Sequence, residues 1–333
     1  MHVASNPLEK PNTMTRDTLL LVEKCSHCFS WYDIESGERL RSVALPEFPH
    51  EFVTDAANRY AYVGHYGIEH SGITGAGGHA IFQIDLRLAT LVRSIDLYPF
   101  NRLHGLQMDA QDRLYALSEE KATLLVLAQP ATDTAPQRAV PSGGIKSHLF
   151  ALTRDGQTAY CMNLLSHTVT KVKPWDPLFA PQACHPGQKP EGYCLSEDEK
   201  TLFVSNRWSN TLCAIDTDSM AVRLSAPSRD DVTRIYRHRD GRLFTSNYGD
   251  RSLSVVDPST LREIDYVKLG GRAIALSFHP TQPLAFISQD DDRVAVLDTQ
   301  SLRILRYITT QREPDVSKVV QLCSALKSNP LHP

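Results

Sequence analysis

A strand pattern that recurs along most of the chain constrains the fold more than any other feature of the sequence. In residues 201–226 a short apolar strand is followed by a polar turn, a second strand ending in Ile-Asp, a Thr-Asp-Ser turn and a third strand. This is the pattern of an antiparallel meander. Similar units follow at 243–267 and 285–309, and weaker ones precede it at 60–85 and 159–172. The sequence therefore predicts an all-β protein built from repeated antiparallel units.

The spacing of these units indicates the architecture. They recur about every 40 to 45 residues, which is the length of one four-stranded blade of a β-propeller. Inner strands are expected near residues 49, 103, 147, 190, 233 and 273. The first blade has only three strands of its own, at 18–23, 28–33 and 39–44, so we expect residues 316–322 to add its inner strand and close the ring. This predicts a seven-bladed β-propeller with four-stranded antiparallel blades, six or eight blades being the neighbouring possibilities.

The same strand pattern predicts one domain with a short segment at each terminus. Residues 17–323 form the propeller, residues 1–16 are a polar N-terminal extension, and residues 324–333 are a C-terminal tail. The units SNRWSNTLCAID and SNYGDRSLSVVD resemble the YVTN-type β-propeller repeat of bacterial proteins. The resemblance implies a propeller of the lactonase or lyase type. It implies little about activity, because such propellers carry lactonases, lyases, redox enzymes and interaction modules.

Composition excludes several classes of partner. The formal net charge of −3 leaves no basic field for nucleic acid or for an anionic membrane surface. No apolar run approaches the length of a membrane span, and residues 1–16 lack the apolar core of a signal peptide. The seven cysteines are scattered, which fits reduced thiols. We therefore predict a cytoplasmic protein whose partner is a small molecule, while the sequence leaves the oligomeric state open.

Aligning the blades on the turn after each inner strand places similar residues at one position. The aligned segments HEFVTDAAN, HGLQMDAQD, HLFALTRDG and EGYCLSEDE begin with His50, His104, His148 and Glu191. The closing strand contributes Asp315 by the same count, whereas the sixth and seventh blades have Thr233 and Ile274 there and break the pattern. Equivalent residues of inner strands form a ring around the channel, so these side chains are expected to converge.

Three imidazoles and a carboxylate are a ligand set for a divalent transition metal. We predict a metal site formed by His50, His104, His148 and Glu191, with Asp315 as a further ligand or a partner of one. Fe(II) is favoured, with Cu, Mn and Zn as alternatives. The competing interpretation is a polar channel that holds water or a small anion.

A long insertion lies next to this position. Residues 64–79 are rich in glycine and histidine and replace a turn of about four residues in other blades. The insertion is predicted to overhang the channel mouth as a lid, with His65 and His70 as candidate catalytic residues. Arg207, beside Trp208, is a further candidate for holding a substrate carboxylate. Cys25 and Cys28, in the sequence CSHC, are interpreted as a turn residue and a buried thiol.

These features predict a metal-dependent enzyme that acts on a small organic molecule at the top of the channel. A mononuclear non-haem oxidoreductase or oxygenase is the first hypothesis, because its metal is held by the same kinds of ligand. A lyase, hydrolase or isomerase that uses the metal as a Lewis acid is the second. A propeller that binds a ligand or protein without catalysis is the third.

Overall fold

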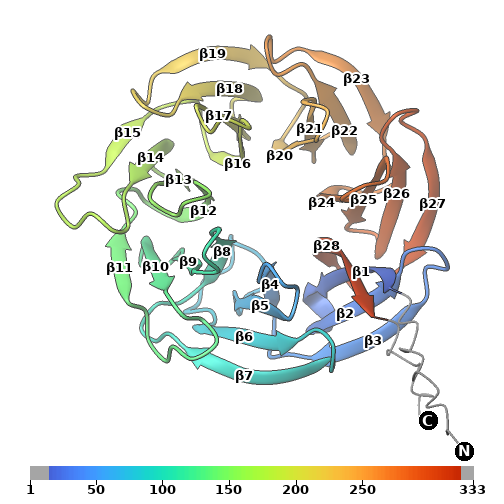
Figure 1. Cartoon of the computed structure of the whole chain (residues 1–333). Helices are drawn as coiled ribbons and strands as arrows, with labels where there is room; N and C mark the ends of the chain where they lie inside the picture. Colours follow the sequence, from blue (N-terminus) through green and yellow to red (C-terminus); the bar gives the residue numbers. More distant parts are fainter. Residues whose placement is uncertain (1–14, 324–333) are drawn as a thin grey trace, which may run out of the picture.

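The computed structural model describes residues 15–323, and these form a closed ring of seven four-stranded antiparallel sheets around a central channel (Figure 1). The predicted all-β, seven-bladed propeller is therefore confirmed. We number the blades 1 to 7 in chain order. Within each blade the strands run in sequence order from the channel outwards, except in blade 1, where the last strand of the chain is innermost.

The strands of blades 1 to 3 have the following bounds: β28 (Pro314–Cys323), β1 (Thr15–Glu23), β2 (Cys28–Asp33) and β3 (Arg39–Ala44); β4 (Pro49–Thr54), β5 (Tyr60–His65), β6 (Ala80–Asp85) and β7 (Thr90–Asp96); β8 (Leu103–Met108), β9 (Leu114–Ser118), β10 (Thr123–Leu127) and β11 (Arg138–Pro141). A single 3₁₀ turn, η1 (Lys24–Ser26), joins β1 to β2.

The strands of blades 4 to 7 are β12 (Ser147–Leu152), β13 (Ala159–Asn163), β14 (Thr168–Val172) and β15 (Gln182–Cys184); β16 (Pro190–Leu195), β17 (Thr201–Asn206), β18 (Thr211–Asp216) and β19 (Val222–Pro227); β20 (Val232–Arg237), β21 (Leu243–Asn247), β22 (Ser252–Val256) and β23 (Glu263–Lys268); β24 (Ala273–Phe278), β25 (Leu284–Gln289), β26 (Arg293–Asp298) and β27 (Ile304–Thr309).

Ring closure follows the predicted route. β28 pairs antiparallel with β1, with Leu19 opposite Val319 and Thr18 opposite Val320. The inner edge of blade 1 is thus filled by the other end of the chain, which ties the first and last blades together. β1 begins at Thr15, two residues before the expected start of the domain. The predicted tail at 324–333 lies outside the described residues, as do residues 1–14.

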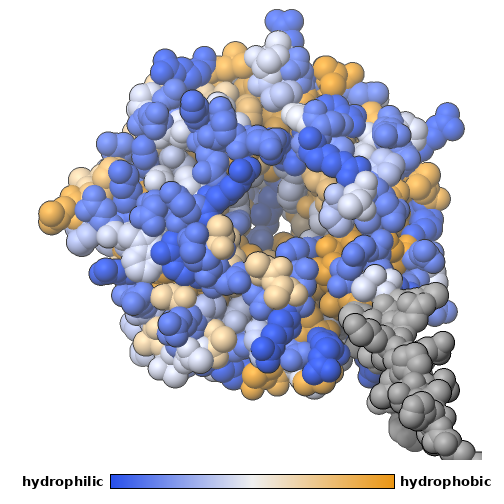
Figure 2. All heavy atoms as spheres, in the orientation of Figure 1, coloured by the Kyte–Doolittle hydropathy of each residue, from blue (hydrophilic) through white to orange (hydrophobic). Residues whose placement is uncertain are grey.

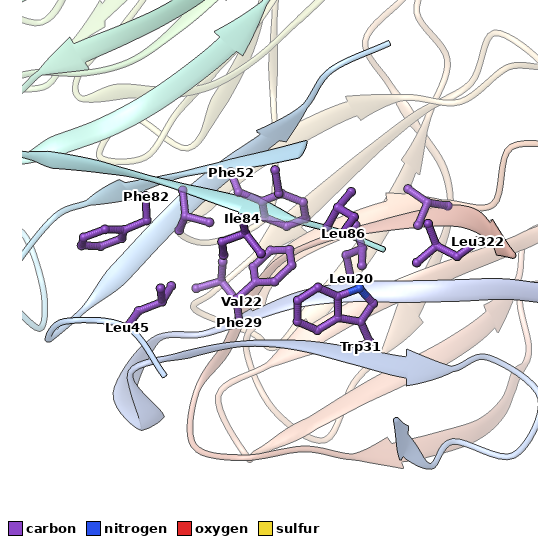
Figure 3. Close-up of a cluster of buried hydrophobic side chains, with 13 residues drawn as sticks. Leu20, Val22, Phe29, Trp31, Leu45, Phe52, Phe82, Ile84, Leu86 and Leu322 are labelled. Carbon is purple, nitrogen blue, oxygen red and sulfur yellow. The ribbon is translucent and has the colours of Figure 1, made fainter. Parts of the chain in front are cut away.

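Apolar side chains fill the interfaces between neighbouring blades. Between blades 1 and 2, Phe29 packs edge-on against both Trp31 and Phe52, and Phe82 and Ile84 complete the contact from β6 (Figure 3). Similar clusters lie between the other neighbouring blades. The two faces of each blade are therefore buried against different neighbours, which explains why the middle strands read as nearly continuous apolar runs. The channel wall is left to the inner strands.

Candidate functional site

A bulge at the start of every inner strand produces the ring of side chains that the sequence predicts. In β4, β8, β12, β16, β20 and β24 the pairing with the next strand is interrupted after the first residue, and in β28 it is interrupted after Pro314. The second residue is in each case left unpaired. A bulge redirects a side chain out of the regular alternation. The residues at this position are His50, His104, His148, Glu191, Thr233, Ile274 and Asp315.

The five predicted metal ligands line one pocket of about 500 Å³ in the channel. The central opening of the ring is hollowed and bordered mainly by hydrophilic residues (Figure 2). Ile274 is the one aliphatic residue among the described residues that line the pocket. The others are Lys24, Cys25, His50, Tyr66, Glu69, His70, Ser71, His104, His148, Glu191, Arg207, Arg234, Tyr248, Arg272, Asp290, Asp292, Arg312, Glu313 and Asp315. The pocket therefore suits a small polar ligand.

The three histidines form a buried stack. The ring centroids of His50 and His104 are 4.1 Å apart, and those of His104 and His148 are 3.6 Å apart. The residues are only 8%, 1% and 5% exposed, respectively. Burial lowers the pKa of His50 and of His104 well below the ordinary value, and neighbouring positive charges add to the effect. Both rings are therefore neutral near pH 7, which is the state that binds metals.

Tyr66 and Glu119 hold this stack from the side of the insertion. The Tyr66 ring packs edge-on against His50 and His104, and its hydroxyl donates to the Glu119 carboxylate at 3.0 Å. His148 Nδ1 lies 2.5 Å from Glu119 Oε2. Burial raises the pKa of Glu119, but its interactions with His148, Lys146 and Tyr66 together outweigh burial and lower the pKa below the ordinary value. Glu119 is thus ionised and accepts a hydrogen bond from Nδ1–H of His148, which leaves Nε2 facing away from this carboxylate.

Glu191 has a dedicated cationic partner. Its carboxylate accepts a hydrogen bond from Arg207 Nη1 at 2.9 Å, while Nε and Nη2 of the same guanidinium bind Asp231 at 2.6 and 2.8 Å. Burial raises the pKa of Glu191, but Arg207 and the other positive charges nearby together outweigh burial and lower the pKa to about 2. Arg207 was predicted to hold a substrate carboxylate. The structure instead places its guanidinium between two carboxylates of the chain itself.

Asp315 is the least compensated carboxyl group of the pocket. Neither of its buried oxygens has a hydrogen-bond partner among the described residues. His50 Nδ1 lies 3.1 Å from one of them, but without the alignment of a hydrogen bond. Burial raises the pKa of Asp315 to about 7, and the positive charge of Lys24 opposes part of that rise. Asp315 therefore lies beside the histidine stack, as expected, in a position to contact His50 or its ligand.

Sequence analysis missed two further residues, Arg234 in the pocket wall and its partner Glu51. Arg234 Nη2 donates to Glu51 Oε1 at 2.9 Å and joins blade 6 to blade 2. A glycine makes room for the backbone of Arg234. A Cβ at Gly192 would lie 2.6 Å from the Arg234 Cα, so only glycine lets β16 and β20 approach this closely.

The donors present fit a divalent metal. His50, Glu51 and His104 offer ligand atoms that all lie within 4.8 Å of one another. The Nδ1 atoms of His50 and His104 are buried without a hydrogen-bond partner in the described part of the chain. Buried polar atoms are normally paired, so these nitrogens suit a bound cation. Glu191 is not part of this group, in which Glu51 supplies the carboxylate.

The insertion between β5 and β6 lies at the channel mouth, but its two histidines have different positions. His70 is exposed and lines the pocket. His65 is absent from the pocket lining, and its ring lies 5.2 Å from that of Phe82. Arg102 fixes the insertion by donating to the carbonyl oxygens of Ile73 and Gly75 while Nη1 binds Glu119. The insertion is thus tied to the same carboxylate that holds His148.

Cys28 is buried, as predicted, whereas Cys25 lines the rim of the pocket. Cys25 Sγ donates to Glu313 at 2.8 Å. Burial and this carboxylate raise the pKa of the Cys25 thiol to about 12. Cys25, Glu69 and Glu313 also come within 4.8 Å of one another, but Lys24 pairs with Glu313 and competes with any cation there.

Comparisons with solved structures support the fold. A functionally unknown protein from Desulfotomaculum acetoxidans superposes with a TM-score of 0.74 at 13% identity, covering 91% of this chain and 98% of its own. The periplasmic gluconolactonase of Pseudomonas aeruginosa gives a TM-score of 0.71 at 17% identity, with 91% and 99% covered. The dihydro-heme d1 dehydrogenase NirN gives 0.64 at 17% identity, covering 92% of this chain and 66% of its own. No protein-family model and no curated protein matches the sequence.

These likenesses define the chain as a seven-bladed propeller with structural neighbours of the gluconolactonase type. The resemblance to the YVTN repeat stays a prediction. Within residues 15–323 no helix has the length and apolar character needed to cross a membrane. The predicted cytoplasmic location is not tested by this, and one structural neighbour is a periplasmic protein.

Proposed function

We propose that the channel pocket is the active site of a metal-dependent enzyme that transforms a small polar carbonyl compound by Lewis-acid and acid–base chemistry. The observation that carries the proposal is a pair of buried, neutral histidines, His50 and His104, beside the Glu51 carboxylate. Their Nδ1 atoms have no hydrogen-bond partner among the described residues. His148 is the next donor in the stack. Glu191 and Asp315, the other predicted ligands, line the same pocket and are assigned to its wall.

A bound divalent metal would polarise a carbonyl group and lower the pKa of a bound water. The residues of the chain supply the remaining functions. Glu119 holds the proton on His148 Nδ1, so Nε2 is available to bind the metal or to accept a proton. The Tyr66 ring covers the edges of His50 and His104 and limits the access of bulk water. His70, on the insertion, is placed to contact a bound substrate.

The lining of the pocket supports a polar substrate. A wall of charged and hydroxyl-bearing side chains with one aliphatic residue favours a hydrophilic substrate. Hydrolysis of a lactone or a polar ester is the first reaction to test, because one propeller neighbour is a gluconolactonase. Oxidation by Fe(II), the favoured prediction from the sequence, remains the second candidate, because two imidazoles and a carboxylate also suit that metal.

Metal analysis of the untagged protein tests the proposal. We expect close to one equivalent of a transition metal in the wild type and a sharp loss in His104→Ala. The matched control is His238→Ala, which removes a histidine that is equally buried but outside the pocket. Metal-free protein reloaded with Zn²⁺ should hydrolyse a lactone if the Lewis-acid assignment is right. Activity restored by Fe(II) alone, with O₂ consumed, would select oxidation instead, and no metal in either protein after reconstitution would reject the site.

A further inference from the structure

Arg234 is the buried cation of the described pocket lining whose hydrogen-bonding capacity is least used. A guanidinium has five N–H donors. The Arg234 side chain is 12% exposed and makes one hydrogen bond within the described residues, from Nη2 to Glu51. Its Nε is buried and has no hydrogen-bond partner in the part of the chain that the structure describes. Buried donors that lack acceptors in the protein indicate that the acceptor comes from elsewhere.

The other basic residues of the pocket are already matched or lie in solvent. Arg207 binds Glu191 and Asp231. Arg272 binds Asp290, and Lys24 binds Glu313. Arg312 is exposed at the rim. Arg234 is therefore the buried cation of the described pocket lining with the largest number of unused donors.

The position of Arg234 places those donors beside the histidine stack. Its partner Glu51 belongs to the group whose ligand atoms lie within 4.8 Å of those of His50 and His104. The charge of Arg234 is also among the causes that lower the pKa of both histidines, as expected for a neighbouring cation. An oxyanion bound by the guanidinium would thus lie next to the proposed metal position.

We propose that Arg234 is the anion-binding residue of the pocket and that the substrate carries a carboxylate or phosphate group next to its reacting carbonyl. The assignment of this anion to a substrate rests on the proposed function, whereas anion binding by Arg234 does not. Arginine matches both oxyanions because its planar fork can donate two parallel hydrogen bonds. Glu51 competes with such an anion for the guanidinium, whereas Glu191 is already paired with Arg207.

The test uses metal-free full-length protein, so its outcome is independent of the metal site. Thermal unfolding and calorimetric titration are followed with inorganic phosphate and, separately, with D-gluconate, at constant ionic strength. We expect saturable stabilisation by at least one of the two probes, and the preferred probe identifies phosphate or carboxylate as the group recognised. Arg234→Met should weaken that binding about tenfold or more. The control Arg293→Met removes an arginine outside the pocket and should bind like the wild type.

A second variant, Glu51→Gln, tests the proposal even if Arg234→Met does not fold. In Glu51→Gln the competing carboxylate is neutralised and Arg234 remains, so anion binding should become tighter than in the wild type. The proposal is wrong if Arg234→Met binds the anion as tightly as the wild type does, if neither probe binds, or if Glu51→Gln weakens binding. Loss of metal binding in His104→Ala with anion binding retained would separate this inference from the proposed function.

Discussion

At the scale of single residues, the Glu119 carboxylate connects three elements around the pocket. Its carboxylate accepts hydrogen bonds from His148, Tyr66 and Arg102, which come from blade 4, from the insertion and from the start of blade 3. A carboxylate behind a ligating histidine fixes the tautomer and the orientation of the ring. Glu119 is therefore a positioning residue whose effect is transmitted through His148 and Tyr66.

Replacing Glu119 by glutamine should weaken metal binding while the fold is kept. The amide can donate to the histidine nitrogen instead of accepting from it, so His148 can place its proton on Nε2 and lose that ligand position. We expect metal affinity to fall about 10- to 100-fold, measured by competition with a chelator of known affinity. The matched control is Glu120→Gln, the adjacent residue, whose side chain is 36% exposed and pairs with Lys121. Equal affinities in the two variants would show that Glu119 has no positioning role.

At the scale of elements, β28 contributes to ring closure, to two apolar clusters and to the pocket. It is the inner strand of blade 1 and pairs only with β1, from the opposite end of the chain. It also contributes Val320 to the apolar cluster between blades 1 and 2 and Val319 to the cluster between blades 1 and 7. Loss of this strand would expose both interfaces and remove Asp315 from the pocket.

Val320→Lys tests this role. The substitution places an ammonium group in the apolar cluster that contains Leu20 and Trp31. We expect the free energy of unfolding to fall by about 3–5 kcal/mol, measured by denaturant titration. Gln321→Lys places the same side chain at the next position, which is exposed and opposite Asp17, and should change stability little. Similar stabilities for the two variants would mean that β28 does not seal the ring.

Most elements of this fold are predictable because each blade repeats the same order of strands and turns. The expected inner-strand starts at 49, 103, 147, 190 and 273 coincide with those of β4, β8, β12, β16 and β24, and β20 begins one residue earlier than expected. The repeat also gives the bulge position, and so it predicts which side chains share the pocket. β15 was missed because it has only three residues within a proline-bearing connection.

Partners contributed by other blades are not predictable in the same way. Glu119 lies in the turn sequence Ser-Glu-Glu-Lys, which resembles a solvated turn, and its burial depends on the insertion from blade 2. Glu51 and Arg234 are 183 residues apart and meet only because the ring closes. The Arg207 guanidinium is bound by Asp231, a residue that directly precedes the first strand of the next blade. A blade-by-blade alignment contains the position of each residue but not the contacts between blades.

At the scale of the whole molecule, the ring makes a local site depend on closure of the entire chain. The inner strands converge on the pocket from all sides, and blade 1 is complete only when residues from both ends pair. A cation held by His50, Glu51 and His104 would join blades 2 and 3 directly, and blade 4 through the stack with His148. Any ligand that binds the native state and not the unfolded chain stabilises the former by mass action.

Metal addition should therefore stabilise the whole propeller rather than one blade. At a free metal concentration about 100-fold above the dissociation constant, the gain is about 2.7 kcal/mol. Scanning calorimetry of the metal-free protein should show one unfolding transition that moves to higher temperature as a single peak when metal is added. His104→Ala should lose the shift, and the control His238→Ala should retain it. A peak that splits on metal addition would mean that the blades unfold separately, whereas an equal shift in His104→Ala would place the metal outside the histidine stack.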